Sequence, residues 1–177
     1  IALSQINPTV GDLDGNARII RDIIKSFSPI CDLIVFPEMA LTGYPPQDLL
    51  LDSAFIQQTS KTLNSIARSV KTVPVIIGTV RKENNHLFNT AAILQDGDII
   101  DYRDKTHLPT YDVFDEDRYF TSAQSIDPVA ININGKKVLI GIQICEDLWD
   151  REHDIKVSQE LSDKGSKYLI NISASPY

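Results

Sequence analysis

The chain has 177 residues, of which 42% are hydrophobic, 23% charged and 7% aromatic, values typical of one soluble globular domain with a hydrophobic core. Its 17 basic and 24 acidic residues give a formal net charge of −7, and no cluster of Lys or Arg suggests binding to nucleic acid or to an anionic membrane surface. Because no apolar run is long enough to cross a bilayer and no basic-then-apolar segment opens the chain, we expect neither a transmembrane helix nor a signal peptide.

The alternation of strands and helices is clearest in the first hundred residues. The predicted elements are strands at 1–6, 32–36 and 74–80, helices at 16–27 and 55–70, and two further strands at 88–95 and 98–103. The strand at 32–36 is apolar without interruption, which is typical of a sheet covered on both faces. Asp96 and Gly97 form the turn between the last two strands.

The second half begins with a long irregular stretch, residues 106–128, whose density of aromatic side chains argues against disorder. Asn134-Gly135 then predicts a hairpin, residues 150–164 a helix that ends at Gly165, and residues 167–173 a final strand. The order of elements predicts an α/β domain with a mixed sheet. Since the sequence begins inside an apolar run and ends directly after a buried strand, we expect residues 1–177 to be one domain truncated at both ends.

The two cysteines, Cys31 and Cys145, lie far apart and lack the spacing of zinc ligands. No cysteine framework suggests a structural disulfide either. We therefore expect no metal site and a reducing, cytoplasmic environment. Cys31, which has no acid or base signal of its own, is interpreted as a small core residue.

Three chemically reactive side chains each follow the end of a predicted strand: Glu38, Lys105 and Cys145. In sheets covered by helices, side chains from several strands converge at the strand ends. Each residue also has an ordinary interpretation, since Glu and Lys are usually solvated and a single cysteine is more often a small core residue. The combination of the three, however, offers a base, a cation and a nucleophile.

The pKa values of the base and the thiol determine what such a combination requires. A cysteine attacks as the thiolate and needs a base to remove its proton. The ordinary pKa values of Glu and Cys, about 4.3 and about 8.5, differ by about 4 units, or roughly 6 kcal/mol against direct transfer. Glu38 would therefore have to be buried, and burial would have to outweigh the opposing effect of Lys105 on its pKa.

The histidines His86, His107 and His153 offer an alternative base, because a Cys-His pair is the more common way to activate a thiol. No signature of a cysteine protease surrounds Cys145, however.

The segments around these residues resemble a known family. FPE, the K-x-x-L-P segment at Lys105 and Cys145-Glu146, in that order, resemble the Glu-Lys-Cys triad of the nitrilase superfamily of carbon-nitrogen hydrolases. ALTGYPPQDLL, LPTYDVFDEDRYF, ICEDLW and NISASPY resemble the glutaminase domain of the glutamine-dependent NAD+ synthetases. That family more often has Asn and Gly where this chain has Thr110 and Asp112. The resemblance implies a nitrilase-like α-β-β-α sandwich with mixed sheets, of which the C-terminal part is missing here.

The resemblance also implies roles. Glu38 would be the general base, Cys145 the nucleophile on the side-chain amide of glutamine, and Lys105 the stabiliser of the oxyanion. The backbone N–H of Glu146 would be the second donor to that oxyanion. The substrate contacts it implies are Tyr111, Glu146, Trp149 and Ser175. For Tyr111 and Trp149, packing is the alternative interpretation.

In that family, ammonia passes to a C-terminal synthetase domain that uses ATP and Mg²⁺ to amidate deamido-NAD+. Its SGG-x-x-S loop does not occur in this sequence, so we expect ATP and Mg²⁺ only in a domain outside the chain. For the glutaminase step we expect no cofactor. We also expect a homo-oligomer. Two alternatives stay open: a stand-alone amidase of the nitrilase superfamily that acts on another amide, and a catalytically silent scaffold.

Overall fold

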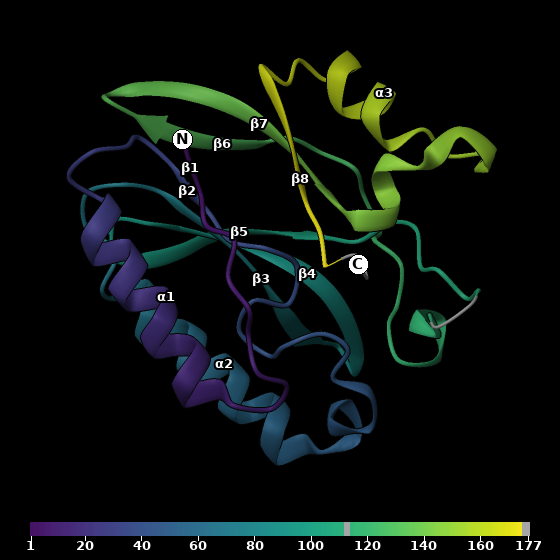
Figure 1. Ribbon diagram of the computed structural model, residues 1–177. Coiled ribbons are helices and arrows are strands. Elements are labelled where there is room, and N and C mark those ends of the chain that lie inside the picture. Colours follow the sequence, from purple (N-terminus) through teal and green to yellow (C-terminus); the bar gives the residue numbers. More distant parts are fainter. Residues whose placement is uncertain (112–113, 175–177) are drawn as a thin grey trace.

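The computed structural model describes residues 1–111 and 114–174 and consists of two β-sheets that face each other, with helices on the outer faces (Figure 1). The strands of the larger sheet, in spatial order, are β1 (Ala2–Leu3), β2 (Ile34–Val35), β3 (Val75–Glu83), β4 (His86–Gln95) and β5 (Asp98–Asp104). The smaller sheet contains β6 (Val129–Ile133), β7 (Lys136–Ile144) and β8 (Tyr168–Ile172). The helices are α1 (Leu13–Phe27), α2 (Ser53–Ala67) and α3 (Val157–Asp163).

Both sheets are mixed, as the family resemblance implies. β1, β2 and β3 run parallel, and β4 and β5 continue antiparallel. In the smaller sheet β6 is antiparallel and β8 parallel to β7. The hairpins turn at Asn84-Asn85, Asp96-Gly97 and Asn134-Gly135, and each of these residues has the positive φ that a two-residue hairpin turn of this kind requires.

Three apolar layers hold the sandwich together. Ile20 of α1 and Ile66 of α2 are fully buried against the outer face of the larger sheet. Between the sheets, Ile76 and Ile93 pack in one cluster with Ile142. Helix α3 covers the outer face of the smaller sheet, where it packs on β7 and β8. The layer order α-β-β-α confirms the predicted fold class.

Three predicted elements are shorter in the structure by three or more residues. β2 ends at Val35, because Phe36 donates a last backbone hydrogen bond to Ile76 and Pro37 has no N–H to continue the ladder. β1, paired only to this short strand, is equally short. The helix predicted at 150–164 is instead a 3₁₀ turn, η4 (Asp150–Glu152), followed by α3. The Lys156 ammonium donates to the carbonyl oxygens of Asp150 and Arg151 between the two, in place of the N–H groups of a continuous helix.

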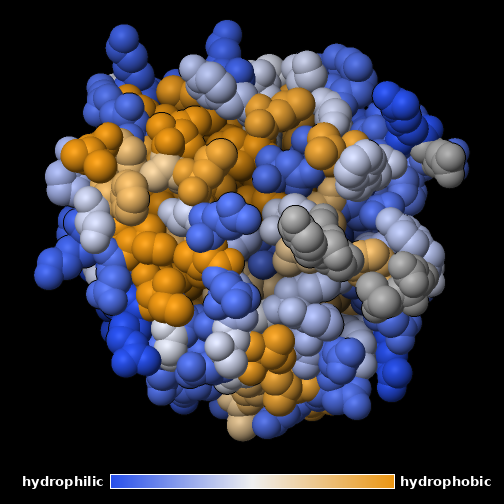
Figure 2. All heavy atoms as spheres, viewed as in Figure 1, coloured by the Kyte–Doolittle hydropathy of each residue, from blue (hydrophilic) through white to orange (hydrophobic). Residues whose placement is uncertain are grey.

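Strands β1 and β8 form open edges of the two sheets, and Figure 2 shows a broad hydrophobic area on the face where these strands lie. On these two strands, Leu3 is 77% exposed and Leu169 45%. Within the described part of the chain, no helix is both long and apolar enough to cross a membrane.

Candidate active site

The residues that follow β2, β5, β7 and β8 meet at one end of the sandwich. Glu38 stands in the turn after β2 and is 1% exposed. Gly78 of β3 lies directly beneath this turn: a Cβ at Gly78 would come within 2.2 Å of the Pro37 carbonyl oxygen and 2.5 Å of the Glu38 Cα. The backbone of Glu38 can therefore lie on β3 only because position 78 has no side chain.

Lys105 follows β5 and is as deeply buried as Glu38, at 1%. Its ammonium Nζ lies 2.9 Å from Glu38 Oε1 and 2.8 Å from Oε1 of a second carboxylate, Glu116 of η2 (Glu116–Arg118). Asn89 of β4 donates to Glu38 Oε1 at 2.7 Å and to Glu116 Oε2 at 3.3 Å. One buried ammonium thus holds two carboxylates, and one amide joins the same two.

The electrostatics of this buried cluster follow from its composition. Burial alone would lower the pKa of the Lys105 ammonium, but the carboxylates of Glu38 and Glu116 outweigh it and raise that pKa above its ordinary value. Burial raises the pKa of Glu116, against the opposing effect of Lys105. The pKa of Tyr44, whose hydroxyl donates to Glu116 at 3.1 Å, is raised by burial and by the two carboxylates.

Cys145 begins the 3₁₀ turn η3 (Cys145–Leu148) directly after β7 and has a φ of 48°, a left-handed conformation that is uncommon for a residue with a Cβ. Asn171 of β8 holds this conformation from both sides. Its Oδ1 accepts from the Cys145 N–H at 2.9 Å, and its Nδ2 donates to the Cys145 carbonyl oxygen at 3.3 Å. The thiol therefore stands at a sharp turn between β7 and η3, and Asn171 holds the backbone of that turn.

Two consecutive residues after β8 connect the cysteine with the buried charges. The Ser173 hydroxyl lies 3.3 Å from Cys145 Sγ, and the backbone N–H of Ala174 donates to Glu38 Oε2 at 2.9 Å. The structure therefore brings the three predicted residues, Glu38, Lys105 and Cys145, to one place. A hollow of about 280 Å³ reaches this place between Glu38, Tyr44 and Ser173.

A wider hollow of about 820 Å³ opens beside Cys145 and is lined by Tyr111, Glu146, Leu148, Trp149, Arg151 and His153. The Tyr111 hydroxyl donates to Glu146 Oε2 at 2.7 Å, a bond that raises the pKa of this tyrosine to about 12. Trp149 is 67% exposed, so it is not a core residue as the packing alternative supposed. Three of the four predicted substrate contacts line this hollow. The fourth, Ser175, lies outside the described residues, as does Asp112.

The histidines contact other groups. The rings of His107 and His153 stack with centroids 3.9 Å apart, and His153 Nε2 lies 3.5 Å from Glu146 Oε1. Burial and the neighbouring His153 lower the pKa of His107. His86, the first residue of β4 in the β3–β4 hairpin, lies 3.0 Å from the Thr121 hydroxyl. Glu38, in contrast, is connected to the cysteine through the consecutive residues Ser173 and Ala174.

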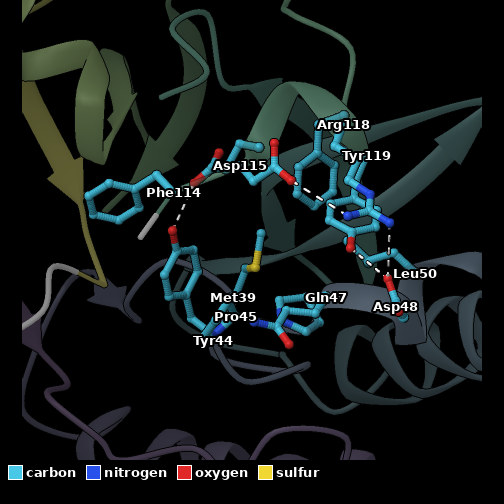
Figure 3. A pocket seen from close by; sticks show the side chains of 13 residues that line it. Met39, Tyr44, Pro45, Gln47, Asp48, Leu50, Phe114, Asp115, Arg118 and Tyr119 are labelled. Atoms are coloured by element: carbon cyan, nitrogen blue, oxygen red, sulfur yellow. Dashed lines mark hydrogen bonds and ion pairs between the residues drawn. The ribbon is translucent and has the colours of Figure 1, made fainter. Parts of the chain in front are cut away.

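A further hollow, of about 260 Å³, is also lined by Tyr44. Figure 3 shows the side chains around it. Met39 and Leu50 contribute apolar side chains to it, whereas Arg118 lies 3.8 Å from Asp115 and 4.0 Å from Asp48 at its charged rim. Glu116 lines this hollow and Glu38 lines the hollow of about 280 Å³, so each of the two carboxylates borders a cavity. No group of three or more His, Cys, Asp or Glu side chains within residues 1–111 and 114–174 could hold a metal ion.

Two members of the buried cluster, Glu116 and Asn89, were not predicted from the sequence. Glu116 stands between Asp115 and Asp117, and only burial separates it from these neighbours. Asn89 is a polar residue in the otherwise largely apolar strand segment FNTAAIL, a signal that could have marked it.

Residues 1–176 match the carbon-nitrogen hydrolase family. The chain belongs to this family. Among curated relatives of this carbon-nitrogen hydrolase, it is 38% identical to the glutamine-dependent NAD(+) synthetase of Synechocystis, with 100% of this chain and 34% of that protein covered. It is 35% identical to the enzyme of the same name from Aquifex aeolicus, of which it covers 30%. The chain thus spans about a third of the length of these relatives.

Solved structures of related proteins also match this chain. A glutamine-dependent NAD+ synthetase from Acinetobacter baumannii superposes with a TM-score of 0.86 at 30% identity, over 99% of this carbon-nitrogen hydrolase chain and 32% of the other. An amidase from Nesterenkonia shares the fold, with a TM-score of 0.80 at 18% identity over 99% of this chain and 64% of the amidase. The resemblance in the sequence motifs is confirmed at the level of the family and of the named relatives.

Proposed function

We propose that this carbon-nitrogen hydrolase domain is the glutaminase part of a glutamine-dependent NAD+ synthetase. The observation that carries the proposal is the buried Glu38–Lys105 pair, joined through Ser173-Ala174 to a cysteine at a strained turn. Glutamine-dependent NAD+ synthetases among the relatives, at 33–38% identity over the full chain, support the choice of substrate.

In the first step, Cys145 Sγ attacks the side-chain carboxamide carbon of glutamine and its proton passes to Glu38. Lys105 compensates the negative charge that develops on the amide oxygen. When the C–N bond breaks, Glu38 returns the proton to the nitrogen, ammonia leaves and a glutamyl thioester remains on Cys145. Water, activated by Glu38, then hydrolyses the thioester and releases glutamate.

The second donor to the oxyanion follows from the backbone of the turn. The N–H of Cys145 already donates to Asn171, so it is not available to the substrate. The N–H of Glu146 is the next along the chain, in the first turn of η3, where helical N–H groups lack intrahelical partners. We assign it the role of oxyanion donor together with Lys105.

Recognition of the amino-acid end of glutamine is assigned to the hollow beside Cys145. Glu146 supplies a carboxylate for the α-ammonium group, and Tyr111 orients that carboxylate through its 2.7 Å hydrogen bond. Trp149 forms part of the wall. Ser175 is retained as a proposed contact from the sequence resemblance alone.

For the whole protein we propose a C-terminal synthetase domain that takes up the ammonia and uses ATP and Mg²⁺ to amidate deamido-NAD+. The relatives, three times as long as this chain, support this arrangement. The hydrophobic area along β1 and β8 supports packing against further polypeptide, because exposed apolar areas of this kind mark protein contacts. A homo-oligomer and a cytoplasmic location belong to the same proposal.

The test compares amides in the full-length protein that contains residues 1–177. We expect kcat/KM for glutamine to exceed that for butyramide, which lacks both the ammonium and the carboxylate, by at least about 100-fold. Glu146→Gln should reduce this preference and leave butyramide turnover within about threefold. Equal or better turnover of butyramide would instead support the stand-alone amidase, and turnover of neither amide would support the silent scaffold.

A further inference from the structure

Asp147, two residues after Cys145, has a carboxylate that none of the steps above uses. It is 1% exposed and accepts three backbone hydrogen bonds. Oδ1 accepts from the N–H groups of Thr106 at 3.0 Å and His107 at 2.9 Å, and Oδ2 accepts from the N–H of Ile144 at 3.0 Å. Thr106 directly follows Lys105, and Ile144 directly precedes Cys145.

The two segments that this carboxylate joins belong to different sheets. Lys105 follows β5 of the larger sheet and Cys145 follows β7 of the smaller one. The sheets are held face to face by apolar side chains such as Ile93 and Ile142, and apolar contact is non-directional. Packing of this kind does not by itself fix how far the Lys105 ammonium lies from the Cys145 thiol. Hydrogen bonds from both backbones to one carboxylate do.

We propose that Asp147 is a positioning residue that sets the distance between Lys105 and Cys145 and thereby tunes the reactivity of the thiol. The inference deepens the proposed glutaminase mechanism and rests on it only for the effect on turnover. Its effect on the thiol is independent of which amide the enzyme hydrolyses.

A purely stabilising role fits the carboxylate poorly. Burial raises the pKa of Asp147 to about 6, although the three N–H donors and Lys105 act in the opposite direction. The ionised form is therefore disfavoured in its own site relative to water. The charge of this carboxylate is costly at neutral pH, yet the carboxylate binds the backbone next to two of the three proposed catalytic residues. A positioning role therefore explains Asp147 better than a stabilising role.

Asp147→Asn tests the proposal with little change in volume. The amide keeps one acceptor oxygen but turns an NH₂ group toward an N–H donor, so one of the two backbone segments loses its partner. We expect kcat for glutamine to fall roughly 10- to 100-fold with KM within about threefold, because a displacement of about 1 Å at a reacting group costs that much. Asp147→Glu, which restores the charge but lengthens the side chain, should recover only part of this loss.

A readout that needs no glutamine is the alkylation of Cys145 by iodoacetamide as a function of pH. A thiolate displaced from Lys105 is less stabilised, so we expect the apparent pKa of alkylation to rise by about one unit or more in Asp147→Asn. Among the described residues, other charged or titratable groups that act electrostatically on this site or lie against it include Glu38, Glu116, Glu146, Tyr44, Tyr111 and His107. None of these is altered by the substitution.

Gln95 supplies the matched control. At another point between the sheets, its Nε2 donates to the Asn132 carbonyl oxygen at 2.9 Å and its Oε1 accepts from the Asn132 N–H at 3.0 Å. Gln95→Ala removes an inter-sheet connection of the same kind remote from the thiol, and we expect it to leave kcat and the alkylation profile unchanged.

The outcomes separate the two proposals. An unchanged alkylation profile and unchanged kcat in a folded Asp147→Asn would overturn the positioning role, and so would equal changes in Gln95→Ala. If the unsubstituted enzyme alkylates normally but hydrolyses no glutamine, the proposed function fails, and a shifted profile in Asp147→Asn would still support the positioning role.

Discussion

The buried charges and the open hollow beside Cys145 are neighbours with opposite organisation. Glu38 and Lys105 are each 1% exposed, and every bond between them and Asn89 or Glu116 lies inside the protein. Across the thiol, Tyr111 and Trp149 are 54% and 67% exposed and contact solvent over much of their surface. The groups proposed for chemistry are fixed before a substrate arrives. Two of the groups proposed for recognition, Tyr111 and Trp149, are open to receive it, and the third, Glu146, is 7% exposed.

This contrast has a physical reason. A preorganised charge in a water-excluded site stabilises a transition state without reorganising when the reaction occurs. A recognition surface must instead exchange water for substrate in each cycle. Substitutions in the buried cluster should therefore change kcat, and those in the hollow should change KM.

The largest expected effect is that of Glu38→Gln. Loss of the base should lower kcat roughly 10²- to 10⁴-fold with little change in KM. The fold should persist, because the ammonium of Lys105 keeps Glu116 as its partner at 2.8 Å. Steady-state kinetics against glutamine check this, with Glu83→Gln, which alters an exposed carboxylate bound to Arg81, as the control. An increase in KM larger than the decrease in kcat would contradict the assignment of the buried cluster to chemistry rather than to recognition.

Gly78→Ala should follow, with kcat lowered roughly 100-fold, because the new Cβ would displace the Glu38 backbone 2.5 Å away. Gly141→Ala is the matched control in β7. Its Cβ would meet the side chains of Leu169 and Ser166 rather than the backbone beside a reactive group. It should lower thermal stability and leave kcat unchanged in assays below its melting temperature. Equal losses of activity in the two variants would refute the account of Gly78.

Asp147 predicts a pH dependence of stability on the buried side. Its pKa is raised in the folded state to about 6 from an ordinary 3.8, so the folded protein binds this proton more tightly than the unfolded chain. The resulting stabilisation is complete below about pH 4 and is lost as the pH rises through about 6. In urea unfolding, the free energy of unfolding of Asp147→Asn minus that of the unsubstituted protein should increase by up to about 3 kcal/mol from pH 4 to pH 7. A constant difference across this range would contradict it.

Tyr111→Phe should have the smallest effect and the opposite kinetic signature. Removing the hydroxyl that donates to Glu146 should raise KM for glutamine roughly tenfold and leave kcat within about threefold. Tyr119→Phe removes a similar bond, 2.6 Å from the tyrosine hydroxyl to Asp48 in the hollow of Figure 3, and should leave both constants unchanged. A fall in kcat for Tyr111→Phe would instead indicate that this tyrosine takes part in catalysis rather than in substrate recognition.

The sequence predicts the positions of Glu38, Lys105 and Cys145 because each follows a predicted strand, although only the strands before Glu38 and Cys145 are strongly apolar. It also predicts the Asn134-Gly135 hairpin, whose turn residues determine the local backbone. The layer order of the sandwich came from the family resemblance, since alternating elements alone indicate only a mixed α/β domain.

Glu116 shows where such prediction stops. Its neighbours Asp115 and Asp117 are as acidic, and only the folded chain buries one of the three. The same holds for the break in the helix predicted at 150–164, which depends on the Lys156 side chain reaching two backbone carbonyls. Long-range burial and side-chain-to-backbone bonds are properties of the folded chain rather than of local pattern.

The central claim is that Cys145 is a nucleophile whose thioester chemistry depends on Glu38. Incubation of the full-length protein with a diazo-ketone analogue of glutamine, followed by mass spectrometry of the peptides, tests it most directly. We predict one adduct on the peptide that contains Cys145, lost in Cys145→Ala and strongly slowed in Glu38→Gln. Labelling that persists in Cys145→Ala, or that proceeds at the same rate without Glu38, would contradict the account.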